Sequence, residues 1–132
     1  QPVLTFNAQR SLPPASTMKL ITTATAFAVL GEEYTYQTRL DYDGVLRGDT
    51  LLGSLRLRGV GDPSLGSGRF PGFPDWKAQL LSWVQAVQKA GIRVITGRVV
   101  ADDGAFGENT TPGGWPWDDL GNYYGAGATG LM

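Results

Sequence analysis

The sequence predicts an α+β fold in which the middle of the chain forms a separate unit. Three observations support this prediction: a strongly apolar helical segment near the start, an alternating strand pattern in the middle, and proline- and glycine-rich joints between them. The chain has 132 residues, of which 42% are hydrophobic, so it is long enough for one modest domain or for pieces of two. We expect three regions, at residues 1–38, 39–112 and 113–132.

The first region is predicted to contain a short strand, a loop and a buried helix. Residues Val3–Ser11 have the pattern of a strand followed by a loop, and Pro13-Pro14 then keeps the chain extended, since the residue before a proline avoids the helical conformation. Ser16–Leu30 is apolar nearly all round, which is typical of a buried helix. Gly31 is suited to end this helix because glycine accepts left-handed backbone angles.

The middle region begins with a predicted meander of antiparallel strands. Tyr34–Tyr42 and Leu51–Leu57 alternate in the way that strands do. The turns between them are expected at Asp43-Gly44 and at Arg47-Gly48-Asp49.

A loop, a second helix and a further strand follow. Gly59–Pro74 has the composition of a loop, and Asp75 is the expected cap of an amphipathic helix that ends at Gly91. Its apolar face is predicted to consist of Leu80, Leu81, Val84 and Val87. Val94–Ala101 has the pattern of a strand, and 102–122 is rich in turns and contains Trp115 and Trp117. We expect these two tryptophans to pack the inserted unit against the main domain, the alternative being that they line a cleft.

Composition excludes several classes of function. The chain has 11 Lys and Arg against 12 Asp and Glu, so no basic surface is available for nucleic acid. It has no Cys and no His, which excludes thiol nucleophiles, Cys/His zinc sites and any Ser-His-Asp triad within this chain. No metal-ligand spacing is visible and no cofactor is expected. No stretch reaches the roughly 18 consecutive apolar residues of a membrane span.

Ser16 and Lys19 are the candidates for chemistry. Residues three apart on a helix share a face, so the Lys19 ammonium can reach the Ser16 hydroxyl. A lysine beside the positive end of a helix and apolar side chains holds its proton less tightly and can serve as a base. The structural alternative is that Ser16 caps the helix and Lys19 is a surface residue. A lysine in the first turn is locally unfavourable, which favours the catalytic interpretation.

Four stretches in order resemble the penicillin-binding proteins, in particular the class C low-molecular-mass D-alanyl-D-alanine carboxypeptidase/endopeptidases. Leu12–Ala24, which contains Ser16-Thr17-Met18-Lys19, resembles the nucleophile motif of that family. Leu57–Leu65 is similar to its strand-to-loop signature, and Gly97–Phe106 resembles a strand of its inserted domain. Gly114–Asp119, with the following Tyr123-Tyr124-Gly125-Ala126, resembles the return to the main domain.

The resemblance implies a partial β-lactamase/transpeptidase-like domain with an inserted β-rich α/β subdomain. It implies that Ser16 is the acylated nucleophile, that Lys19 is the base, and that the Ser16 backbone N–H is an oxyanion donor. It places Asp102 and Phe106 in a pocket for the free amino end of the diamino acid in the peptidoglycan stem. Asp103 is an equally suitable carboxylate, and the structural alternative is an ordinary turn at the end of a strand.

Two further family motifs, Ser-x-Asn and Lys-Thr-Gly, do not occur in this sequence. We therefore expect the chain to be the truncated amino-terminal part of such an enzyme, inactive by itself and with an exposed apolar helix face. A second chain carrying the remainder would complete it. The implied partners are peptidoglycan stem peptides and β-lactams, and the implied location is outside the cytoplasm. A serine β-lactamase is the nearest relative in chemistry, and a non-catalytic cell-wall or protein-binding module is the alternative of another class.

Overall fold

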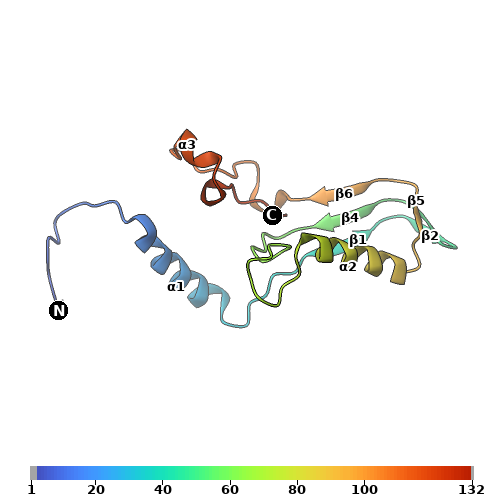
Figure 1. The fold of residues 1–132 in the computed structure, drawn as a ribbon, viewed down its shortest axis with the longest axis horizontal. Helices are drawn as coiled ribbons and strands as arrows, with labels where there is room; N and C mark the ends of the chain where they lie inside the picture. Colours follow the sequence, from blue (N-terminus) through green and yellow to red (C-terminus); the bar gives the residue numbers. More distant parts are fainter. Residues whose placement is uncertain (1–2, 132) are drawn as a thin grey trace. The chain divides into compact units, whose positions relative to one another are not determined.

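The computed structural model describes residues 3–131 and has the predicted α+β class (Figure 1). The chain divides into two compact units, Gln1–Thr35 and Tyr36–Met132. Met132, the last residue of the third predicted region, lies outside the described residues.

The first unit is a turn of 3-10 helix, η1 (Ala15–Thr17), that leads directly into helix α1 (Met18–Leu30). Gly31 ends α1 with a φ of 82°, and its N–H donates to the Phe27 carbonyl at 2.9 Å, as the sequence predicts. The strand predicted within Val3–Ser11 was wrong, because these residues form bends and a turn. A strand needs a neighbour for its backbone groups, and the described part of this unit contains no other strand.

Helix α1 is apolar but not covered. Its side chains at Leu20, Ile21, Phe27 and Val29 are between 61% and 75% exposed. The described part of the first unit, residues 3–35, offers no further helix or strand of three or more residues for these side chains to pack against besides η1. The described residues of the first unit therefore do not bury α1. The exposed apolar helix face that we expect of a truncated chain is present.

The second unit begins with one long β-hairpin rather than the predicted meander. Its four segments are β1 (Arg39–Tyr42), β2 (Val45–Arg47), β3 (Thr50–Leu52) and β4 (Leu55–Arg58). Antiparallel pairing runs in one continuous register from Arg39 opposite Arg58 to Arg47 opposite Thr50. A two-residue turn closes the hairpin at Gly48, whose φ is 60°.

The hairpin is interrupted at the same level on both arms. Between β1 and β2 the Asp43 N–H donates to the Ser54 carbonyl at 3.0 Å, and the Ser54 N–H returns a bond to the Asp43 carboxylate at 2.8 Å. Gly53 lies at the crossing, where an added Cβ would come 2.1 Å from the Asp43 carbonyl oxygen. Glycine is required here because the two backbones approach too closely for a side chain.

Helix α2 (Trp76–Lys89) connects the hairpin to two parallel strands, β5 (Val94–Ile95) and β6 (Val99–Asp102). Strand β5 pairs with β3 and β6 pairs with β4, which gives two three-stranded sheets in the orders β2-β3-β5 and β1-β4-β6. The single strand predicted over Val94–Ala101 is split at Gly97. An added Cβ at Gly97 would lie 2.4 Å from the Gly53 carbonyl oxygen, so the split continues the break in the hairpin.

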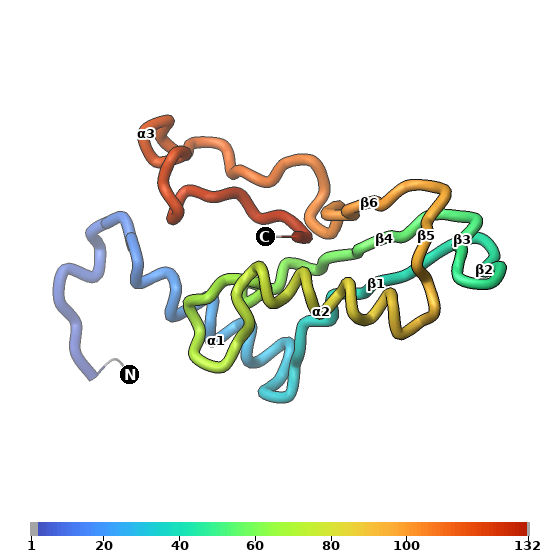
Figure 2. Tube along the Cα trace, turned by 45° about the vertical axis from the view of Figure 1, so that its right-hand side comes forward, coloured from blue at the N-terminus to red at the C-terminus, as the bar shows by residue number. Residues whose placement is uncertain are grey.

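Helix α2 runs along the sheet, as both views show (Figure 2). The Asp75 carboxylate caps it by accepting the Ala78 N–H at 2.8 Å, as predicted. Leu80, Val84 and Val87 of the predicted apolar face line a cavity of about 530 Å³ between helix and sheet, whereas Leu81 is 61% exposed. The buried hydrophobic side chains of the described residues are Leu51, Leu55 and Ile92.

The rest of the second unit contains only short helical turns: η2 (Gly104–Phe106), α3 (Trp117–Leu120) and η3 (Tyr123–Gly125). Trp117 is 88% exposed and Trp115 37% exposed, so the packing role favoured for them is not realised within this unit. The end of the described chain returns to the sheet, where Gly130 donates to the Asp103 carbonyl at 2.9 Å and accepts the Gly61 N–H at 2.8 Å.

Candidate active site

The predicted pair of the first unit is brought together. Ser16 lies in the middle of η1 and Lys19 is the second residue of α1, and the distance from Lys19 Nζ to Ser16 Oγ is 3.5 Å. The spacing of three residues is therefore sufficient for the ammonium to donate to the hydroxyl. This is a loose hydrogen bond, of the kind that tightens when a substrate is bound.

The turn that carries Ser16 is fixed by its neighbours on both sides. The Thr17 N–H donates to the Pro14 carbonyl at 3.0 Å, and the Thr17 hydroxyl donates to the same oxygen. Ala15, immediately before Ser16, has a φ of 44°, in the left-handed region that residues with a Cβ seldom adopt. The sequence analysis did not predict this conformation.

Ser16 does not cap the helix. No side-chain hydrogen bond caps either η1 or α1, and the hydrogen bond found for the Ser16 hydroxyl is the one from Lys19. The Met18 N–H donates to the Ala15 and Ser16 carbonyls, so η1 and α1 are continuous, and the positive end of the helix dipole lies at the turn that carries Ser16, where it can stabilise a developing negative charge. Both side chains are exposed, so the described first unit does not itself supply the desolvation expected around Lys19.

Asp102 and Phe106 belong to the second unit, at the carboxyl end of β6 and in the η2 turn that follows. The Asp102 carboxylate forms an ion pair with the Arg58 guanidinium, 3.4 Å from its Nε, and accepts a hydrogen bond from the Gly104 N–H at 3.3 Å. Strand register brings this ion pair together, because Arg58 and Asp102 are direct partners in the β4–β6 ladder. Within the part of the chain that the structure describes, the Asp103 carboxylate has no such partner and is exposed.

Phe106 is half exposed and rests against Gly61. An added Cβ at Gly61 would lie 2.4 Å from Phe106 Cε2, and Gly61 has a φ of 82°. Glycine is therefore favoured at position 61 for two reasons: a Cβ would meet the Phe106 ring, and the positive φ is unfavourable for a residue with a side chain. Asp62 follows in the loop, and its carboxylate accepts the Ser64 N–H at 2.8 Å. The structure thus joins two stretches that the sequence analysis treated separately, the loop after β4 and the end of β6.

The sequence analysis missed the partners of the predicted site residues. Arg58 and Gly61 stand inside the strand-to-loop stretch, but their contacts depend on the parallel β4–β6 pairing, which no local pattern encodes. Among residues 3–131, no group of three or more acidic side chains is arranged to hold a metal ion. None of the helices described is long and apolar enough to cross a membrane.

The structure thus places a serine and a lysine one helical turn apart on an α+β chain, an arrangement in which a lysine could serve a serine nucleophile as its base. The whole chain, residues 1–132, matches the D-Ala-D-Ala carboxypeptidase 3 (S13) family. The chain belongs to this family, which confirms the resemblance drawn from the four sequence stretches.

Two curated relatives agree. The chain is 31% identical over 120 residues to D-alanyl-D-alanine carboxypeptidase DacB of Haemophilus influenzae, covering 91% of this chain and 23% of that protein. It is 31% identical over 109 residues to the D-alanyl-D-alanine carboxypeptidase of Actinomadura sp. strain R39, covering 82% of this chain and 18% of that protein. The chain therefore spans only about a quarter or less of the length of these relatives.

Solved structures give the same result for the fold. The structure of penicillin binding protein 4 (dacB) from Haemophilus influenzae matches with a TM-score of 0.74 and 31% identity, over 89% of this chain and 24% of that one. The same protein in complex with a β-lactam matches with a TM-score of 0.63 and 31% identity, over 76% of this chain and 21% of that one. The fold is that of part of a penicillin-binding protein.

Proposed function

We propose that this chain carries the nucleophile of a serine-type D-alanyl-D-alanine carboxypeptidase or endopeptidase that cleaves peptidoglycan stem peptides outside the cytoplasm. The observation that carries the proposal is the 3.5 Å separation of Lys19 Nζ and Ser16 Oγ at the start of α1. Membership of the D-Ala-D-Ala carboxypeptidase 3 (S13) family supports the substrate class. The Lys19 side chain is the basic group that the structure places beside the Ser16 hydroxyl, which supports it as the base.

In this mechanism the Lys19 side-chain nitrogen takes the hydroxyl proton as Ser16 Oγ attacks the carbonyl carbon of the penultimate D-alanine. The Ser16 N–H donates to the oxyanion that forms. The C–N bond then breaks, and the amine of the departing residue receives the proton that Lys19 took from the hydroxyl. Water hydrolyses the resulting ester and restores the Ser16 hydroxyl. The difference between a carboxypeptidase and an endopeptidase is what leaves with that amine.

Residues 1–38 and 113–132 would belong to the domain that holds this nucleophile, and residues 39–112 would form the inserted subdomain. Asp102 and Phe106 would line the pocket for the free amino end of the stem peptide. The ion pair with Arg58 partly neutralises the charge of Asp102. Asp103, whose carboxylate is exposed, is therefore the alternative partner for the ammonium group at the free amino end of the stem peptide.

Penicillin acylation tests the nucleophile in a protein that carries this sequence followed by the Ser-x-Asn and Lys-Thr-Gly motifs, called the longer protein below. Incubation with a fluorescent penicillin is expected to label Ser16, because a β-lactam carbonyl is attacked in the same way as the peptide; one of the matching structures holds a β-lactam. Ser16→Ala is expected to abolish the label. Lys19→Ala is expected to slow labelling by about a hundredfold or more, the usual contribution of a general base.

The matched control is Ser11→Ala, which removes another exposed serine of the first unit and should leave labelling unchanged. Label that persists in Ser16→Ala would remove Ser16 as the nucleophile. A longer protein that binds a D-alanyl-D-alanine peptide equally well with and without Ser16, and never acquires label, would instead be a non-catalytic cell-wall binding module.

A further inference from the structure

The second unit contains an apolar cavity that the proposed mechanism does not use. It lies between α2 and the sheet and has a volume of about 530 Å³, within the range of roughly 300–1,000 Å³ that is usual for small-molecule sites. Leu55 and Val99 are direct partners in the β4–β6 ladder, so they face the cavity together. The apolar lining includes Leu80, Val84 and Val87 from α2, and Leu40, Leu55 and Val99 from the strands.

The side chains of this unit do not fill the cavity. Leu80 and Val84 on the helix side are 49% and 51% exposed, and Val99 on the sheet side is 70% exposed. Water is a poor occupant, because an apolar lining offers it few hydrogen-bond partners. An apolar ligand that replaces water there gains the free energy of burying its own surface and that of the lining. The cavity is therefore suited to a hydrocarbon group.

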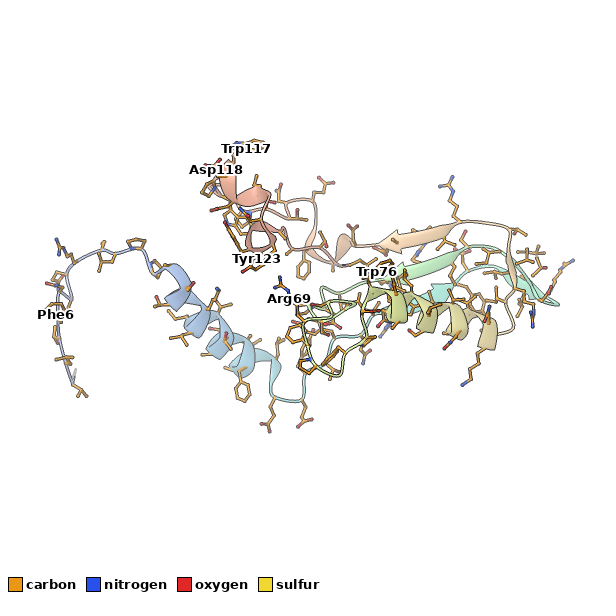
Figure 3. The ribbon with its side chains drawn as sticks, viewed as in Figure 1. Phe6, Arg69, Trp76, Trp117, Asp118 and Tyr123 are labelled. Atoms are coloured by element: carbon orange, nitrogen blue, oxygen red, sulfur yellow. The ribbon has the colours of Figure 1, made fainter. Side chains whose placement is uncertain are left out.

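The space under α2 is elongated. A second cavity, of about 240 Å³, adjoins the first and shares Leu57, Leu80 and Trp83 with it as lining residues. This smaller cavity reaches Trp76, the first residue of α2 (Figure 3). From Trp76 to Gln88, the lining residues of α2 cover about 18 Å of helix at ~1.5 Å per residue. An unbranched chain suits a space of this shape better than a broad ring system does.

Polar side chains line the larger cavity at the carboxyl end of α2. Gln88 is in the last turn of the helix, and Arg93 is the one charged residue among the described residues that line the cavity. Two backbone hydrogen bonds fix this end: the Ile92 N–H donates to the Val87 carbonyl at 3.2 Å, and the Arg93 N–H donates to the Asp49 carbonyl at 2.8 Å. The Asp49 carboxylate is charged but is not part of the lining. Within residues 3–131 no ion pair involves Arg93, so its guanidinium can bind an anionic group.

A polypeptide segment is a poorer occupant than a hydrocarbon chain. Each of its residues brings a backbone carbonyl and, except for proline, an N–H, and burial of these groups without partners is unfavourable. The lining offers few such partners, since most of it consists of leucine, valine and isoleucine side chains. A lipid with two chains fits less well than one with a single chain, because its second chain would stay in water.

We propose that this cavity binds a single unbranched acyl chain that ends in a carboxylate, a free fatty acid. The chain lies between α2 and the sheet, and the carboxylate lies on the Arg93 guanidinium. The two adjoining cavities set the length of the chain, and Arg93 selects the charge of its head. The inference is independent of the proposed function, because it uses residues of the second unit alone and none of those assigned to catalysis or to the stem-peptide pocket.

Chain length is the first test. Binding of octanoate, decanoate and dodecanoate to the longer protein is measured by isothermal titration calorimetry, below the concentrations at which these acids form micelles. Each added methylene is expected to tighten binding about threefold to fourfold, the factor that corresponds to burial of one CH₂ group. Affinity that does not depend on chain length would overturn the inference. Absence of binding by all three acids, the result expected if the remainder of the longer protein fills the cavity, would overturn it too.

A second test locates the chain. Val84→Phe adds volume inside the cavity and is expected to weaken dodecanoate binding at least about tenfold, the equivalent of about two methylene groups kept out. Leu81→Phe is the matched control on the same helix, because Leu81 is 61% exposed and is not among the lining residues, and it should leave the affinity unchanged. Val99→Phe fills the cavity from the sheet side and replaces Val84→Phe if circular dichroism shows that the latter is unfolded. Equal affinity of the filled variant and the control would mean that the acid binds elsewhere.

A third test addresses the carboxylate. Arg93→Gln is expected to weaken decanoate binding at least about tenfold, as expected for loss of a charge-assisted hydrogen bond, and to leave 1-decanol, which has the same chain and a neutral head, unaffected. Arg56→Gln is the matched control and should change neither, because Arg56 lies between Leu55 and Leu57 in β4 and its side chain is on the other face of the sheet. Equal loss of acid and alcohol in Arg93→Gln, or no loss of the acid, would contradict the anionic head.

Discussion

Ala15 is a residue whose backbone is held in an unfavourable conformation directly beside the nucleophile candidate. Its φ of 44° brings Cβ close to the following carbonyl, which costs an ordinary residue about 1 kcal/mol or more. The hydrogen bonds from Thr17 to the Pro14 carbonyl close the turn around Ala15 and hold it there. The turn gives Ser16 a fixed position at the start of α1.

Replacement of Ala15 by glycine tests this conformation. Ala15→Gly is expected to raise the free energy of unfolding of the longer protein by ~0.5–1 kcal/mol, because glycine adopts a positive φ without the Cβ clash. Ala24→Gly, the same change in the interior of α1, is the matched control and should lower it by about 1 kcal/mol. The midpoint of urea unfolding measures both. A decrease for both variants would contradict the left-handed conformation at Ala15.

Individual residues of the candidate site were predictable only where the interaction is local. Ser16 and Lys19 are three positions apart on one helix, so their proximity follows from helix geometry. The pairing of Arg58 with Asp102 depends on the register of two parallel strands joined through α2. The seat of Phe106 on Gly61 depends on the same pairing, so a single sequence gives no signal for either contact.

At the scale of the elements, the break in the hairpin lies where three long strands each divide in two: β1 from β2, β3 from β4, and β5 from β6. Gly44, Gly53 and Gly97 lie at this break, and at each of them an added Cβ would come within 2.4 Å of a backbone oxygen. The alternating sequence correctly predicted strands and the turn at Gly48, but the turn predicted at Asp43-Gly44 was wrong, because the chain continues there from β1 into β2. It did not predict that the two arms of the hairpin stay in one register through the break. A glycine within a strand pattern is compatible both with a turn and with a local break in a continuing strand.

Gly53→Ala tests the break. Its Cβ would lie 2.1 Å from the Asp43 carbonyl oxygen, a backbone atom that cannot rotate away, so we expect the free energy of unfolding to fall by about 1–3 kcal/mol. Gly48→Asn at the tip of the hairpin is the control, because asparagine tolerates a positive φ and nothing lies within 4 Å of an added Cβ there. Urea unfolding of the longer protein, followed by circular dichroism, measures both. Equal effects of the two variants would contradict a steric role for Gly53.

At the scale of the whole molecule, each unit has apolar side chains that the described residues of that unit leave exposed. Within residues 3–35, the 13 residues of α1 have no long helix or strand to pack against, and an isolated helix of that length is only marginally stable in water. The α+β class and the family were predictable from the sequence because they rest on ordered motifs along the whole chain. The burial of α1 was not realised, because burial requires a partner element as well as an apolar face.

These properties lead to a prediction for the 132-residue chain by itself. It lacks both downstream motifs, so we expect no penicillin label on Ser16, and its exposed apolar side chains should bind a hydrophobic dye strongly. Mixing the chain with a polypeptide that carries the remainder of the longer protein should cover α1, reduce dye fluorescence and produce label, since packing is what stabilises an apolar helix. The same mixture with Ser16→Ala should lose dye fluorescence but acquire no label. Label on Ser16 in the chain alone would mean that the first turn of α1 activates the serine without the rest of the domain.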